Sequence, residues 1–158
     1  MLFDFETDSE LDRMEWNCHT LQSLSAEHVT HGIRSLKVEL YPSDYPGVSP
    51  VLTRSDWSGY KELCFDIYNP QEHVVTVIVR IDDQRQFPAY EERYNKGFLL
   101  RPGMNRMNIP FSTLLTSGSG RRLNLKGISR LMIFLSHPRE RVVLYLDYIR
   151  LSRGERAV

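Results

Sequence analysis

The sequence predicts an all-β protein, an antiparallel β-sandwich, and three observations lead to this class. Short runs in which apolar and polar residues alternate recur along the whole chain, as in strands with one buried face. Turn-forming combinations of Pro, Gly, Asn and Asp separate these runs. Helical signals are confined to two short pieces, at 7–14 and 110–117. About ten short strands with little helix are typical of a sandwich.

The expected strands follow from period-two alternation. Residues 2–6 alternate two phenylalanines with other side chains, and 35–42 alternates three aliphatic residues with mostly polar ones. The longest run, 73–83, has Val or Ile at alternate positions, and its other face ends in Arg80 and Asp82. In chain order, we expect strands at 2–6, 14–18, 21–25, 35–42, 49–54, 63–68, 73–83, 97–101, 104–109, 130–136 and 142–151.

Length and charge bound the classes of function. The 158 residues fit one domain, 1–158, with a single core. Lys and Arg together number 20, as do Asp and Glu, so no net field attracts nucleic acid. No run approaches the ~20 apolar residues of a membrane helix, so we expect no membrane insertion of this domain. Two locations stay open, a cytoplasmic protein or the extracytoplasmic soluble part of a longer bacterial protein; the second fits better because strand-like sequence begins at residue 2.

Motifs for catalysis and zinc binding are missing from the sequence. There is no G-x-S-x-G, no H-E-x-x-H and no phosphate-binding glycine loop. Asp82 and Asp83 are neighbours on a strand and point to opposite faces, so they cannot flank one glycosidic bond. We therefore expect no enzyme. Cys18 and Cys64 leave both a disulfide and two free thiols open.

The outer face of the sandwich is the expected binding surface. The apolar positions of 63–68 would point into the core, which leaves Asp66 and Tyr68 outside. If 73–83 lies in the same sheet, Arg80 and Asp82 join them on that face. Such a concave face would offer hydrogen-bond donors and acceptors to a hydroxyl-rich ligand. The alternative is a solvated face on which Asp66 and Arg80 form a cross-strand ion pair.

Aromatic residues in the loops are the second part of the predicted site. Aromatic faces favour surfaces rich in C–H groups, such as the faces of sugar rings. Trp57, Tyr90 and Tyr94 are the candidates; for Trp57 the alternative is that it covers one open end of the sandwich. Tyr90 and Tyr94 lie in a long polar segment, which is often functional when it is ordered. Further rings in loops are Tyr45, Tyr60 and Phe87.

Several segments resemble a known fold family. "FDFETDSELDRMEW", "AEHVTHGIRSLKVEL" and "VVLYLDYIRL" resemble a carbohydrate-binding-module-like, galactose-binding-domain-like jelly roll. The middle of the chain, including "DWSGYKELCFDIYNP" and "YEERYNKGFLLRPGMNRMNIP", is similar to domains appended to bacterial VanZ-like membrane proteins and to complex I intermediate-associated protein 30. The resemblance runs from Leu2 to Ser152. It implies a non-catalytic module that binds a glycan; the alternative is a protein-interaction or assembly module of the same fold.

The same resemblance implies a structural calcium ion where the first and last strands meet. The implied ligands are Glu6, Gly32, Ser35 and Asp147, a mixture of carboxylate and carbonyl oxygens of the kind that calcium prefers. The alternative is that Asp147 accepts backbone N–H groups and that Glu6 is a surface charge. In favour of the ion, Asp147 lies in an apolar run, where an uncompensated carboxylate would be costly.

Overall fold

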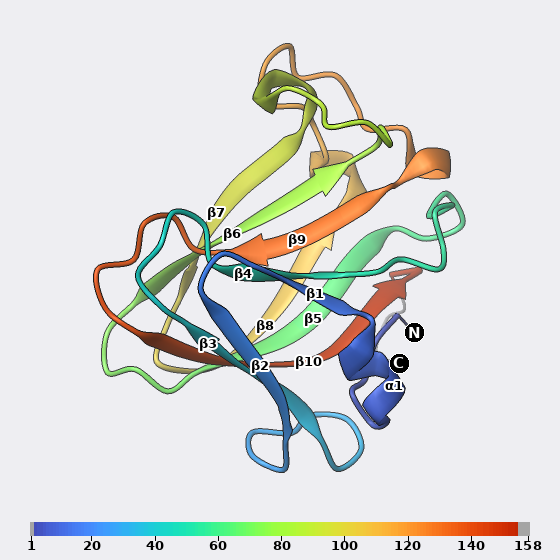
Figure 1. Ribbon diagram of the computed structural model, residues 1–158. Helices are drawn as coiled ribbons and strands as arrows, with labels where there is room; N and C mark the ends of the chain where they lie inside the picture. The colour runs from blue at the N-terminus through green and yellow to red at the C-terminus, as the bar shows by residue number, and fades with distance from the viewer. Residues whose placement is uncertain (1, 155–158) are drawn as a thin grey trace.

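The computed structural model describes residues 2–154, which form two facing antiparallel sheets of five strands each (Figure 1). In spatial order, the first sheet contains β1 (Met14–Asn17), β4 (Gly47–Pro50), β9 (Arg130–Phe134), β6 (Val75–Asp82) and β7 (Tyr94–Leu100). The second contains β2 (Thr20–Ser25), β3 (Ser35–Leu40), β10 (Val142–Ser152), β5 (Glu62–Asn69) and β8 (Gly103–Pro110). The predicted antiparallel sandwich is confirmed.

Helical structure is short, as the sequence indicates. The single α-helix, α1, spans Asp8–Asp12, and three 3-10 turns are η1 (Tyr90–Glu92), η2 (Phe111–Thr113) and η3 (Leu125–Gly127). Within residues 2–154, none of the helices has the length and apolar character needed to cross a membrane. Both cysteines are free thiols, Cys18 exposed and Cys64 buried. Burial raises the pKa of the Cys64 thiol to about 11.

Two predicted strands near turns of the chain differ from the structure, as does the start of β7, which is described with the groove. The run 2–6 forms only a single bridge, between Phe3 and Ile149. Phe5 has φ 61°, a left-handed conformation that ends the extended chain just before α1. The strand expected at 49–54 lies earlier, at β4, and ends at Pro50, which has no N–H to continue a ladder.

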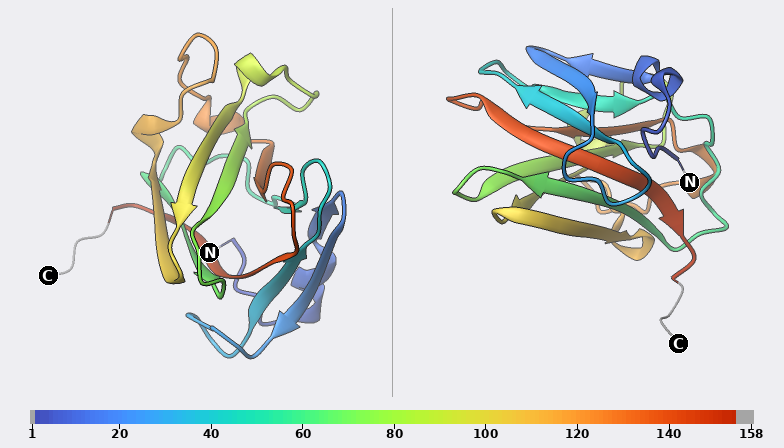
Figure 2. Two further views of the ribbon diagram at one scale, coloured as in Figure 1. Left: turned by 90° about the vertical axis from the view of Figure 1, so that its left-hand side faces the viewer. Right: turned by 90° about the horizontal axis from the view of Figure 1, so that it is seen from below.

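The inner faces of the two sheets form one core between the layers (Figure 2, left). Val77 and Val79 of β6 and Leu63 and Phe65 of β5 are fully buried. Trp57 is fully buried as well, stacked on Phe111 with ring centroids 5.7 Å apart, and its indole N–H donates to a backbone carbonyl. The prediction that Trp57 binds a ligand is therefore wrong, because its ring fills the core and presents no free face.

Strands β5 and β6 belong to different sheets, so the predicted single face carrying Asp66, Tyr68, Arg80 and Asp82 does not exist. The chain crosses between the layers directly after β5. There, the buried side chain of Asn69 donates to the carbonyls of His73 and Leu100 and accepts from the backbone of Gln71. Period-two alternation specifies which face of each strand is buried. Two strands show the same alternation whether they lie side by side in one sheet or face each other across the core, so the pattern does not assign a strand to a sheet.

Tyr94 points into the core, which corrects its assignment as a ligand-binding residue. It lies opposite Ile81 on β6 and is 3% exposed. Its hydroxyl has no hydrogen-bond partner among the described residues. Burial raises the pKa of this phenol to about 12.

We predict that Tyr94→Phe stabilises the protein. An unpaired buried hydroxyl costs about 1–3 kcal/mol of desolvation, and Phe keeps the ring without it. Urea unfolding monitored by circular dichroism should give a higher free energy of unfolding. Tyr90→Phe is the matched control, since that ring is 55% exposed and its loss of a hydroxyl should change little. A clear destabilisation by Tyr94→Phe would contradict the prediction.

Candidate ligand-binding groove

A groove of about 700 Å³ lies on the outer face of the first sheet. Its floor is built from the outward positions of three adjacent strands. Ile78 of β6 is opposite Phe134 of β9, while Arg80 is opposite Met132 of β9 and Asn95 of β7. The inward neighbours of these residues are buried apolar side chains, which fixes the floor residues on the outside. The floor is thus partly apolar and partly hydrogen-bonding.

Aromatic rings line the groove at opposite ends of these strands. Tyr45, in the loop before β4, is 45% exposed and stands edge-on to Phe134, with ring centroids 5.9 Å apart. Phe87 and Tyr90, in the segment between β6 and β7, are 82% and 55% exposed. Strand β9 runs from one of these loop clusters to the other (Figure 1). A ligand lying along the groove would therefore pass between the rings.

A buried ion pair orders the charged side chains of the floor. The Asp82 side chain is 2% exposed and accepts from Nε and Nη2 of Arg80 at 3.0 and 2.8 Å. Arg130 approaches the same carboxylate, with Nε 3.9 Å from Oδ2, and its guanidinium lies over the Phe87 ring at 4.9 Å. The carboxylate therefore orients both arginines, and Arg130 holds Phe87 beside the groove.

Asp83 holds the loop that carries the aromatic wall. Its side chain is 2% exposed; it accepts two hydrogen bonds from Arg121, at 2.8 and 3.2 Å, and one from the backbone of Asn124. Arg121 also pairs with Glu92 of η1. Burial by itself would raise the pKa of Asp83, but these donors outweigh it and hold the pKa below its usual value.

We predict that Asp83→Asn destabilises the protein at neutral pH and has less effect in acid. A carboxyl whose pKa is lower in the folded state contributes stability above its unfolded pKa of about 3.9. That contribution is lost as the pH falls through the lower folded pKa. Because Arg121 is 39% exposed, we expect a loss of only about 1 kcal/mol at pH 7.

Urea unfolding of both proteins across pH 2–7 measures this difference, with the exposed Asp12→Asn as the control. A difference that stays constant down to the lowest pH would contradict the role given to the Asp83 carboxylate.

The centre of the second sheet's outer face is covered, which removes Asp66 and Tyr68 from the candidate site, while outward positions of β8 stay exposed. The loop between β2 and β3 lies across β10 and β5 (Figure 2, right). His28 of this loop stacks on Tyr68, with ring centroids 3.5 Å apart. Asp66 is 2% exposed, and neither of its carboxylate oxygens has a hydrogen-bond partner among the described residues. Arg150, 3.9 Å away, supplies its nearest opposite charge.

Of the seven residues proposed for ligand binding, Arg80, Asp82 and Tyr90 come together at the groove, with Asp82 beneath its floor. Sequence reasoning missed Arg93, Asn95, Arg130 and Met132 as groove residues. A signal was available for two of them: in "RLMIF", alternate positions place Arg130 and Met132 on one face with Phe134. Arg93 and Asn95 could not be assigned in this way, because β7 begins at Tyr94, three residues before the strand predicted at 97–101.

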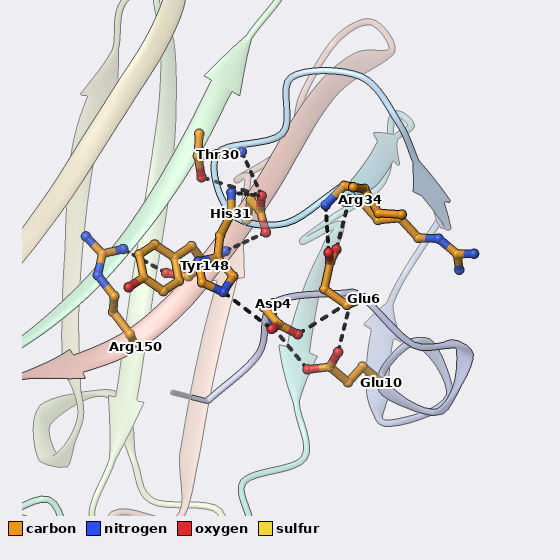
Figure 3. A network of polar contacts seen from close by, with 10 residues as sticks. Asp4, Glu6, Glu10, Thr30, His31, Arg34, Tyr148 and Arg150 are labelled. Atoms are coloured by element: carbon orange, nitrogen blue, oxygen red, sulfur yellow. Dashed lines mark hydrogen bonds and ion pairs between the residues drawn. The ribbon is translucent and has the colours of Figure 1, made fainter.

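The residues proposed for calcium bind backbone amides instead (Figure 3). The Glu6 carboxylate accepts from the N–H groups of Ile33 and Arg34 at 2.6 and 2.8 Å. One oxygen of Asp147 accepts from Thr30 and His31 at 2.8 and 3.0 Å. Burial, the largest influence, raises the pKa of Asp147. Amide hydrogens that point at these oxygens would repel a cation.

The other two residues proposed as calcium ligands, Gly32 and Ser35, help to hold the loop between β2 and β3 in place. Ser35 donates to the carbonyl of Glu27, and Gly32, with φ 72°, lies so close to Glu6 that a Cβ there would be 1.7 Å from Oε1. Among residues 2–154, no group of three or more His, Cys, Asp or Glu could hold a metal ion. The carboxylates of Glu6 and Asp147 are thus engaged by backbone N–H groups, and calcium stays a prediction of the resemblance.

We predict from this geometry that calcium does not stabilise the protein. An ion bound to the folded state would raise the melting temperature with its concentration. Differential scanning fluorimetry in millimolar CaCl₂ and in EDTA should give the same melting temperature. A rise in calcium that EDTA reverses, and that Glu6→Gln abolishes, would restore the calcium site.

Comparisons with known proteins assign the fold. No family model matches the sequence, and no curated protein matches it. Among solved structures, the family 11 carbohydrate-binding module from Clostridium thermocellum, in complex with a β-1,3-1,4-mixed-linked tetrasaccharide, matches with TM-score 0.72 and 18% identity, covering 96% of this chain and 94% of that one. The CBM22-1 xylan-binding domain from Paenibacillus barcinonensis matches with TM-score 0.65 and 14% identity, covering 98% and 95%.

An exo-β-agarase matches with TM-score 0.78 and 18% identity, over 99% of this chain but only 25% of that enzyme. The chain therefore corresponds to a quarter of the enzyme's length. At these identities the likeness shows the fold, which is the jelly roll of carbohydrate-binding modules. The likeness to VanZ-associated domains and to complex I intermediate-associated protein 30 stays a prediction.

Proposed function

We propose that this protein is a non-catalytic glycan-binding module and that its ligand lies in the groove of the first sheet. The observation that carries the proposal is the position of exposed rings at both ends of a hollow whose floor offers hydrogen bonds. Tyr45 lies at one end and Phe87 and Tyr90 at the other, while Arg80 and Asn95 lie between them. The volume of about 700 Å³ is within the range of small-ligand sites, roughly 300–1,000 Å³.

Sugars match this combination of groups. The C–H face of a pyranose ring packs on an aromatic face, and its hydroxyl groups need donors and acceptors close by. A guanidinium offers several donors, and an amide offers both kinds of partner. Structural likeness supports the proposal, since the neighbours matched over nearly their whole length are carbohydrate-binding modules.

The groove offers no pair of carboxyl groups for hydrolysis, which supports a non-catalytic role. Among the described residues that line it, none is Asp or Glu. Asp82 lies below and is paired with Arg80, and general acid–base catalysis needs a carboxyl that reaches the substrate. An assembly module would instead favour a flat, apolar face. We keep it as the alternative. The extracytoplasmic location, with a cytoplasmic protein as its alternative, stays part of the proposal.

We predict that removal of the exposed rings abolishes glycan binding. Affinity gel electrophoresis against a panel of soluble polysaccharides identifies a ligand, and isothermal titration calorimetry then gives its affinity. Tyr90→Ala and Tyr45→Ala should each weaken binding by roughly tenfold or more, as for a ring at the centre of an interface.

Trp16→Ala is the matched control, because this ring is 64% exposed and does not line the groove. The control should bind like the wild-type protein. Absence of binding to every polysaccharide, or equal losses in Trp16→Ala and the groove variants, would overturn the proposed function.

A further inference from the structure

The charged side chains that line the groove all have the same sign. They are Arg80, Arg93 and Arg130, and no acidic residue lines the groove among the described residues. The whole chain has a formal net charge of zero, so this concentration of positive charge is local. The only carboxylate at the floor, Asp82, is buried beneath the arginines and balances one of the three.

Two acidic residues of the wall segment, Glu91 and Glu92, have their own contacts. Glu91 lies against Gly118, where an added Cβ would come within 2.7 Å of the Glu91 Cβ. Glu92 pairs with Arg121 at 3.3 Å. Neither of them lines the groove. Glu91 acts on the charge of Arg93 from a distance, but among the described residues neither of these two carboxylates lines the groove or pairs with its arginines.

Two of the arginines keep donors available for a ligand. Arg93 donates through Nε to the carbonyl of Pro88 at 2.9 Å and makes no ion pair among the described residues. Arg130 is 34% exposed, and the long contact of 3.9 Å to Asp82 leaves its two terminal nitrogens unbonded to described residues. Burial and then the like charge of Arg80 lower the pKa of Arg93, which agrees with arginines held close together.

Neutral sugars need hydrogen-bond donors but no charge, whereas two of the three arginines, Arg93 and Arg130, have no carboxylate within hydrogen-bond distance among the described residues. A guanidinium has a planar fork of donors that matches the paired oxygens of a carboxylate or sulfate, and such charge-assisted hydrogen bonds are roughly twice as strong as neutral ones. Like charges in a half-buried groove repel one another, and an anionic ligand would relieve this repulsion. A neutral glycan would desolvate the same arginines without a counter-charge.

We propose that the groove selects an anionic glycan, one that carries carboxylate or sulfate groups along a sugar chain. This inference rests on the proposed function and specifies the chemical class of its ligand. Rings at the two ends of the groove contact sugar faces, while Arg93 and Arg130 pair with the acidic substituents.

The test compares polysaccharides with and without charge. Polygalacturonate supplies carboxylates and κ-carrageenan supplies sulfate esters; the neutral partners are mixed-linkage β-1,3-1,4-glucan and agarose. Calorimetry on the full chain measures each affinity at low and at high salt. We expect binding to at least one of the two charged polymers, about tenfold or more tighter than to either neutral polymer, and weaker as salt is raised.

The variant Arg93→Gln/Arg130→Gln should weaken binding to the charged polymer by about tenfold or more, with Arg139→Gln, an exposed arginine outside the groove, as the control. Melting temperatures check that each variant is folded. The single change Arg93→Gln replaces the double variant if the latter does not fold, since Arg93 is not part of the buried pair.

The outcomes separate the two proposals. Binding to a neutral glycan that depends on Tyr45 and Tyr90 but not on the arginines would overturn the anionic inference and leave the proposed function in place. Binding to a charged polymer that falls equally in Arg139→Gln would also overturn the inference, because it would reflect non-specific charge. Absence of binding to all four polymers and to the wider panel would overturn both.

Discussion

The buried carboxylate of Asp82 is the group on which the rest of the groove depends. It lies at the last position of β6, and its side chain fixes Arg80 with two hydrogen bonds. Its backbone carbonyl accepts from Ser129, just before β9, so the same residue connects the two central floor strands. A desolvated carboxylate needs an opposite charge or several hydrogen-bond donors beside it, and at Asp82 guanidinium groups of the floor meet this requirement.

Much of the fold could be predicted because burial imposes a local pattern. The side chains of Val77, Val79 and Ile81 are apolar and pack in the core. Because side chains alternate along a strand, Arg80 must then face outward, and its position could be predicted from the sequence alone. The pairing of strands could not be predicted in the same way. The chain crosses to the other sheet after Asn69, and this crossing places β6 across the core from β5 instead of beside it. The alternation of apolar and polar residues is the same in both arrangements, so it does not reveal the crossing.

Aromatic residues were the least predictable part of the site, because a ring near a strand suits a core as well as a ligand. Tyr90 and Tyr94 are four residues apart, yet one is in an exposed turn and the other begins β7 with its side chain opposite Ile81. The roles of Glu6 and Asp147 were equally hard to predict, because a carboxylate can accept backbone N–H groups or bind a metal ion. Their carboxylates both reach the loop between β2 and β3, which offers N–H groups to the oxygens that the resemblance assigns to a metal ion.

That loop has a further consequence, since it covers the centre of the second sheet, over β10 and β5, and leaves the groove of the first sheet as the proposed binding side. A two-sided module could capture two polymer strands and cross-link them. On the proposed function, the groove would hold a single strand, so stronger attachment to a fibrous matrix would have to come from several copies on a common support. Each copy would need its receptive side turned toward the matrix, and the length and stiffness of the tethers would determine the avidity.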